Sequence, residues 1–209
     1  MPIDPRSTLI YHITHAENLA DILTAGGLYS DVQLKLMGRD NSQIGYSHIK
    51  QRRMEEYRIA VCGQRFVGEF VPFYYCPRSP MLYAINKGNT GREPGCQTEI
   101  LHLVSNAGVA MAMGRAWCVS DGNAGAAYTD FATGANALET VNWSVVNSND
   151  WGGSRMHAKA SEFLVADFYP ISAFTAIGCH NERTAERTRS ILQQYGVAIP
   201  VTVQRNWYY

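Results

Sequence analysis

The order of its short apolar segments is the feature that most limits how this chain can fold. Strand-like runs recur over residues 9–13, 69–75, 100–104 and 174–179, and most are not followed by a helical pattern. A doubly wound parallel sheet needs a crossover helix after nearly every strand. The order therefore favours a mixed α+β domain with about six or seven strands and short helices. The chain also lacks a G-x-G-x-x-G turn and a P-loop.

Two segments carry helix signals. Thr14 and Glu17 have the form of a capping box for a helix that the glycines at 26–27 can end. A longer helix is expected over residues 182–195, with Asn181 as its cap. Each of these helices lies next to a predicted strand, so the pattern indicates one continuous α+β unit.

Two long polar stretches interrupt this pattern. Residues 30–70 lack periodicity apart from a short helix expected over 48–57, and residues 132–160 are similarly irregular. Long irregular connections within a compact domain usually serve function. We therefore expect functional residues in or beside both stretches.

Composition excludes several classes of protein. The chain has 209 residues, 46% of them apolar, which suits a single domain over residues 1–209. Its formal net charge is zero, so a polyanion would have to meet a local patch, of which residues 50–58 are the most basic. The five cysteines are widely spaced without a C-x-x-C, which favours reduced thiols and no metal. No early segment is apolar enough for a signal or a membrane span, so we expect a cytoplasmic protein without a membrane partner.

Glu162 is the most conspicuous candidate for chemistry. It stands at the head of the apolar run "EFLV". A carboxylate at the mouth of a buried strand costs desolvation free energy unless it is paired, hydrated or used. It is therefore either a strand-end residue that meets solvent or an arginine, or a functional group.

Other candidates have equally plain structural alternatives. Alternation along the first strand puts His12 and Thr14 on one face, as a polar platform or as a core histidine beside an N-cap threonine. Tyr74 could stack on a ligand ring or belong to the core. Of the adjacent Arg52 and Arg53, only one can face a given groove, as a clamp for an anion, and both could instead be a solvated basic face.

Six motifs together resemble one family. They are "IYHITHAENLADIL", "HIKQRR", "VPFYYCPRSPMLYAI", "TEILHLVS", "KASEFLV" and the terminal "NWYY". Their order and spacing are those of the DarT-type DNA ADP-ribosyltransferase toxins, and the resemblance runs from about residue 9 to residue 209. The run "VPFY-x-x-PRSPML" is more specific than any single catalytic residue.

The resemblance implies an ADP-ribosyltransferase fold in which NAD, the co-substrate, lies in a cleft between two small sheets. The expected activity is transfer of ADP-ribose to a base of single-stranded DNA, with thymine favoured over guanine. A protein- or RNA-directed transferase on the same fold and a nucleotide-binding pseudo-enzyme are the alternatives. The family also implies a partner, the macrodomain antitoxin DarG.

The same resemblance assigns roles to individual residues. Glu162 and Arg53 match the catalytic pair. The residues expected to bind NAD are His12, Ile13, Thr14, Asp21, Tyr29, Arg53 and Tyr74. Asn123 and Lys159 are expected to face the DNA substrate. Ala160 stands where arginine-modifying relatives carry a second glutamate, which disfavours protein arginine as the target.

Overall fold

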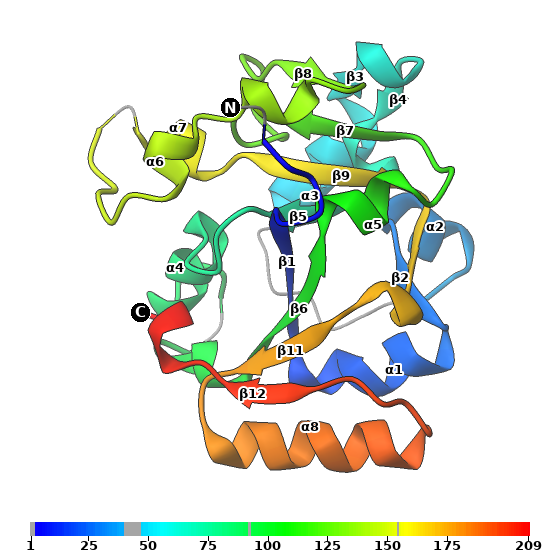
Figure 1. The fold of residues 1–209 in the computed structure, drawn as a ribbon, viewed down its shortest axis with the longest axis vertical. Coiled ribbons are helices and arrows are strands. Elements are labelled where there is room, and N and C mark those ends of the chain that lie inside the picture. Colours follow the sequence, from blue (N-terminus) through cyan, green and yellow to red (C-terminus); the bar gives the residue numbers. More distant parts are fainter. Residues whose placement is uncertain (1–2, 40–46, 92, 154) are drawn as a thin grey trace.

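The computed structural model describes residues 3–39, 47–91, 93–153 and 155–209. Residues 40–46, within the first polar stretch, lie outside the described part of the chain. The fold is mixed α and β, with one large sheet and mostly short helices around it (Figure 1). This agrees with the α+β class expected from the sequence.

The large sheet has eight strands in the order β12-β11-β6-β1-β5-β9-β7-β8. In chain order, their bounds are β1 (Leu9–His15), β5 (Phe70–Tyr74), β6 (Ile100–Asn106), β7 (Trp117–Ser120), β8 (Phe131–Ala132), β9 (Glu162–Ala166), β11 (Ala176–Cys179) and β12 (Val201–Val203). Neighbouring strands pair antiparallel except β11 and β12, which are parallel. The antiparallel pairing explains why crossover helices are scarce in the sequence.

The middle of this sheet is weakly joined. β1 pairs with β6 along its whole length, but it meets β5 only at Tyr11 opposite Tyr74. The strands on the two sides of this junction run in different directions, with β9 and β7 crossing the ends of β1 and β6 (Figure 1). The sheet therefore consists of two four-stranded halves, which corresponds to the two small sheets that the family resemblance implies.

Two small two-stranded sheets accompany the large one. β2 (Gly27–Tyr29) pairs with β10 (Phe168–Pro170), and β3 (Arg58–Ile59) pairs with β4 (Arg65–Phe66). The described residues thus contain twelve strands, and the expectation of six or seven was too low. Strands of two or three residues are too short to show a period in the sequence, which is why they were missed.

Eight α-helices cover the sheet in the described residues. Their bounds are α1 (Leu19–Thr24), α2 (Asp31–Leu36), α3 (Ser47–Glu55), α4 (Pro80–Asn86), α5 (Ala107–Met111), α6 (Trp143–Val146), α7 (Arg155–Lys159) and α8 (Glu182–Gln194). None of them is long and apolar enough to cross a membrane. The first polar stretch, residues 30–70, contains α2, α3 and the β3–β4 hairpin, so it is less irregular than its composition indicated.

The predicted helix caps were right in one case and wrong in the other. Asn181 Oδ1 accepts a hydrogen bond from the Thr184 amide at 2.9 Å, as expected for the N-cap of α8. At the first helical turn, His15 is the N-cap in place of Thr14, because β1 remains paired with β6 through His15. Thr14 Oγ1 instead accepts a hydrogen bond from Asn18 Nδ2 at 3.1 Å.

A buried polar cluster joins the C-terminal residues to the sheet. His102, in β6, is fully buried, with Nε2 2.9 Å from the Pro77 carbonyl oxygen and Nδ1 3.1 Å from the Tyr208 hydroxyl. The Tyr208 hydroxyl also donates to the carbonyl of Ile100 at 2.7 Å. Burial lowers the pKa of His102 to about 4, against the ordinary 6.5, although the Pro77 carbonyl opposes the shift.

This buried histidine predicts acid sensitivity. Between pH 6.5 and about 4 the unfolded chain binds a proton at His102 that the folded chain does not, so stability falls as the pH falls through this range. His102 should contribute up to about 3 kcal/mol to that loss. Urea unfolding at a series of pH values measures the free energy of unfolding, which should depend less steeply on pH over this range in His102→Gln than in the wild type. An unchanged slope would contradict the assignment.

Candidate functional site

A cavity of about 520 Å³ opens where the two halves of the sheet separate. Its walls come from β1, β2, β5 and β9 and from the helices α1 to α4. The expected site residues that line it are His12, Ile13, Thr14, Asp21, Tyr29, Arg53, Tyr74, Asn123 and Glu162. Lys159 does not line it. The volume lies within the usual range of small-molecule sites.

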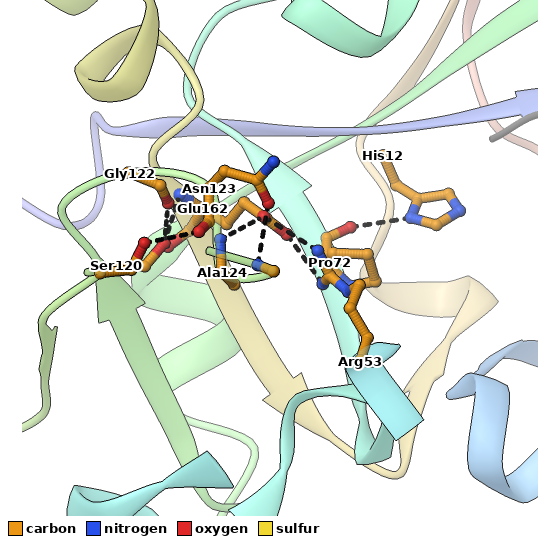
Figure 2. Close-up of polar contacts among 10 residues, drawn as sticks. His12, Arg53, Pro72, Ser120, Gly122, Asn123, Ala124 and Glu162 are labelled. Carbon is orange, nitrogen blue, oxygen red and sulfur yellow. Dashed lines mark hydrogen bonds and ion pairs between the residues drawn. The ribbon is translucent and has the colours of Figure 1, made fainter. Parts of the chain in front are cut away.

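Glu162 is the first residue of β9 and lies opposite Tyr74 in the antiparallel register. Only 2% of its side chain is exposed. Its Oε1 accepts hydrogen bonds from the Ala124 amide at 2.9 Å and from Arg53 Nη1 at 3.0 Å, and its Oε2 accepts one from Arg53 Nη2 at 2.9 Å (Figure 2). The carboxylate is therefore paired and hydrogen-bonded while it still faces the cavity.

The loop that follows β7, residues 120–125, is tied to the start of β9. The Glu162 amide donates to Ser120 Oγ at 2.9 Å, and that hydroxyl donates to the Gly122 carbonyl at 2.6 Å (Figure 2). Asn123 Oδ1 accepts a hydrogen bond from the Gly125 amide at 2.8 Å. These bonds hold residues 120–125 against the carboxylate end of the cavity.

α3 separates the two adjacent arginines by its rotation of about 100° per residue. Arg53 points to Glu162 and leaves 13% of its side chain exposed. Arg52 lies outside, where its Nε donates to Glu56 at 2.8 Å on the exposed surface. Burial acts to lower the pKa of Arg53, but the charge and hydrogen bonds of Glu162 outweigh it and raise the pKa. The guanidinium therefore stays charged.

His12 connects the two halves of the sheet. Its Nδ1 lies 2.8 Å from the Pro72 carbonyl oxygen of β5, which can only accept, so Nδ1 carries the proton (Figure 2). Burial lowers the pKa of His12, against the opposing effects of Pro72 and Asp31. The ring is therefore neutral near pH 7, with Nε2 unprotonated. Thr14, two residues further along β1, is nearly buried and also lines the cavity.

Tyr74 is half-buried and lines the same cavity. Burial, followed by the charge of Glu162, raises its pKa above the ordinary 10, so its hydroxyl is protonated. Tyr29, in β2, also lines the cavity, and its ring centroid lies 4.5 Å from that of Phe168. The cavity thus presents aromatic surface on two of its walls.

Sequence reasoning did not single out one charged pair in this cavity. Lys50 Nζ lies 3.0 Å from Asp31 Oδ1, and both residues line the cavity together with Arg39. The three residues belong to the first polar stretch, where no period distinguishes one charge from the next. The basic composition of residues 50–58 was the signal that could have identified Lys50.

Lys159 lies apart from the cavity, with 3% of the residue exposed. Its Nζ donates to the carbonyls of Val146, at 2.9 Å, and Ser148, and lies 4.6 Å from the centroid of the Trp151 ring. Lys159 therefore fastens the segment after α6 to α7. Its expected contact with the substrate stays a prediction. In the described part of the chain, no group of His, Cys, Asp and Glu side chains could hold a metal ion.

Comparison with known proteins gives one consistent family. The family model described as "DarT: ssDNA thymidine ADP-ribosyltransferase, DarT" matches residues 11–209. A DNA ADP-ribosyl transferase of Thermus aquaticus is 37% identical over 209 residues, which cover 98% of this chain and 90% of that protein. One of Mycobacterium tuberculosis is 30% identical over 215 residues, with the same coverage.

Two solved structures have the same fold along the whole chain. The structure of Thermus sp. 2.9 DarT in complex with ADP-ribosylated ssDNA matches with a TM-score of 0.91 and 31% identity, over 100% of this chain and 99% of that one. The complex of the same protein with NAD⁺ matches with a TM-score of 0.86 and 29% identity, over 100% of both chains.

The buried ion pair predicts a strong asymmetry between the two arginines. Arg53→Ala would leave the Glu162 carboxylate buried without its charge partner, so we expect the free energy of unfolding to fall by about 3 kcal/mol. Arg52→Ala removes only an exposed pair and should change stability little. Urea unfolding of both variants at pH 7 measures the difference, and equal losses would contradict the burial argument.

Proposed function

Since the chain belongs to the DarT family of ssDNA thymidine ADP-ribosyltransferases, we propose that it transfers ADP-ribose from NAD to thymine in single-stranded DNA and releases nicotinamide. The observation that carries the residue assignment is the buried Glu162–Arg53 pair inside the cavity. In one reaction, the carboxylate can stabilise positive charge on the ribose and the adjacent guanidinium can stabilise negative charge on the base.

NAD is proposed to lie along β1 and β5. Thr14 and the neutral His12 offer polar atoms to the ribose and the nicotinamide amide, and Tyr74 offers a ring for the nicotinamide to stack on. Ile13, Asp21 and Tyr29 complete this part of the wall. Because His12 is neutral, it adds no positive charge beside the cationic nicotinamide ring.

Glu162 is proposed to assist cleavage of the bond between nicotinamide and ribose. Each carboxylate oxygen has two lone pairs. Oε1 accepts from Ala124 and Arg53, whereas Oε2 accepts from Arg53 and can accept one further bond from a ribose hydroxyl. Such a bond strengthens as positive charge builds up on the ribose, so it lowers the barrier more than it tightens binding.

The transfer step then needs a base for one proton. The thymine ring nitrogen forms a bond to the anomeric carbon as nicotinamide leaves with the bonding electron pair. The thymine N–H proton passes to Glu162 Oε2, at the lone pair that the ribose hydroxyl gives up. Arg53, adjacent to that carboxylate, stabilises the negative charge that builds up on the thymine as its proton leaves. The protonated Glu162 returns its proton to water after product release.

The substrate is proposed to approach over the loop that carries Asn123, which lines the cavity beside Glu162. Lys159 is proposed, as the family resemblance implies, to contact the DNA strand on the same side of the site. We further propose that the protein acts in the cytoplasm, as the toxin of a toxin–antitoxin pair whose macrodomain partner, DarG, removes the ADP-ribose. All five cysteines are free thiols, in keeping with a reducing compartment.

A substrate panel tests the activity. The protein is incubated with NAD and, separately, with a thymine-containing oligonucleotide, a thymine-free oligonucleotide, RNA and a mixed protein sample. Mass spectrometry should detect added ADP-ribose on the first substrate alone, with one nicotinamide released for each adduct. Equal modification of the thymine-free strand, or modification of RNA or protein instead, would contradict the proposed target.

Glu162→Gln should lower turnover roughly a hundred- to a thousand-fold, because it removes the charge that stabilises the transition state. NAD affinity should change little, since that interaction grows as the bond breaks. Single-turnover transfer assays and NAD titration calorimetry measure the two effects. Glu139→Gln, a change in an exposed glutamate, is the control, and a Glu162→Gln variant with wild-type turnover would remove Glu162 from the mechanism.

Arg53→Lys tests whether the planar guanidinium is needed. Lysine keeps the charge but cannot donate to both oxygens of Glu162 from two nitrogens, as Arg53 does. We expect turnover to stay at least ten-fold low at saturating DNA and low salt, a condition in which weakened phosphate contacts are compensated. Arg52→Lys should retain normal turnover. If Arg53→Lys does so too, charge alone accounts for the role of Arg53.

A further inference from the structure

The loop of residues 121–130 is a closed structure beside the site. The Asp121 amide donates to the Asp130 carbonyl at 3.1 Å, and the Asp130 amide donates to Asp121 Oδ1 at 3.0 Å. Within it, Thr129 Oγ1 donates to the Asn123 carbonyl at 2.6 Å. The backbone is therefore held at both ends, and the bond from the Ala124 amide to Glu162 ties the loop to the site.

Tyr128, in this loop, is 75% exposed, the largest exposed fraction of any large apolar residue in the described part of the chain. Its ring packs on the imidazole of His157, with a centroid distance of 4.8 Å and an angle of 44° between the planes. One face of the tyrosine is therefore backed by another ring, and the other faces solvent. Because its outer face is free and its inner face is supported, the ring can stack on a planar group of a ligand.

His157 is itself held in place. Its ring lies so close to Gly122 that a Cβ at that position would come within 1.9 Å of the His157 Cε1. Its Nε2 lies 3.5 Å from Asp121 Oδ1. The loop and α7 thus hold the Tyr128 ring on a fixed support, and little conformational entropy is lost when a planar ligand stacks on it.

We propose that Tyr128 is a stacking platform for the base of a nucleotide next to the target thymine. This rests on the proposed function. Every base has an aromatic face, and stacking on exposed aromatic rings is a usual means of holding single-stranded nucleic acid. The chain has no net charge with which to attract a phosphate backbone as a whole. Stacking beside the site therefore supplies affinity and places the strand so that one base enters the cavity.

The test compares Tyr128→Ala and Tyr128→Phe with the wild type on a thymine oligonucleotide. Tyr128→Ala should raise the KM for DNA about ten-fold, as loss of one stacked base does, with kcat at saturating DNA and NAD affinity unchanged. Tyr128→Phe keeps the ring and should behave as the wild type. Tyr195→Ala is the control, since that exposed tyrosine follows α8 at the opposite end of the molecule (Figure 1).

A second arm locates the contact on the strand. An abasic linker is placed on the 5′ or the 3′ side of the target thymine; at one of these positions it should raise the wild-type KM about as much as Tyr128→Ala does and have no added effect in that variant. A 2-aminopurine base at the same position should be quenched on binding to the wild type but not to Tyr128→Ala. This fluorescence readout does not depend on turnover.

The outcomes separate the two proposals. Wild-type protein that modifies no thymine oligonucleotide overturns the proposed function. Wild-type transfer with an unchanged KM in Tyr128→Ala, or with equal losses in Tyr128→Ala and Tyr128→Phe, overturns the stacking platform alone. A Tyr128→Ala variant that transfers normally but is no longer neutralised by an antitoxin would assign the ring to a protein contact and would likewise overturn it.

Discussion

The ion pair between Glu162 and Arg53 holds the site together. The two residues are 109 positions apart and belong to β9 and α3, and the Ala124 amide adds a third segment to the same carboxylate. A charge with 2% of its side chain exposed is stable only if its partners stay in place. The pair therefore docks a helix and a loop onto the sheet and, with the same bonds, holds the Glu162 side chain at the cavity wall.

The cavity itself depends on the weak join between β1 and β5. A fully paired ladder there would continue the sheet, but the two strands meet at one residue pair, Tyr11 and Tyr74. The His12 side chain supplies a further link by its bond to the Pro72 carbonyl. A side chain in place of a backbone ladder lets the two halves diverge, and the gap between them is available to a ligand.

Local signals in the sequence predicted several elements well. The N-cap at Asn181 and the strand that begins at Glu162 follow from capping chemistry and from an apolar run. The capping box at Thr14 failed because pairing of β1 with β6 holds Thr14 in the strand, a long-range effect that no local motif reveals. The shortest strands were missed because two or three residues show no period, and only pairing with a partner segment makes them strands.

The sequence by itself determined the family, the α+β class and the set of residue types at the site, because its motifs and their spacing are written along the chain. Only the tertiary structure decided which partner each of these residues has and which of the structural alternatives each one takes. It turned Arg53 inward and Arg52 outward, paired Glu162 with a guanidinium, and placed Lys159 against backbone carbonyls outside the cavity. These outcomes depend on which segments distant in the chain pack together, and the free energy of burying a charge is set by those partners.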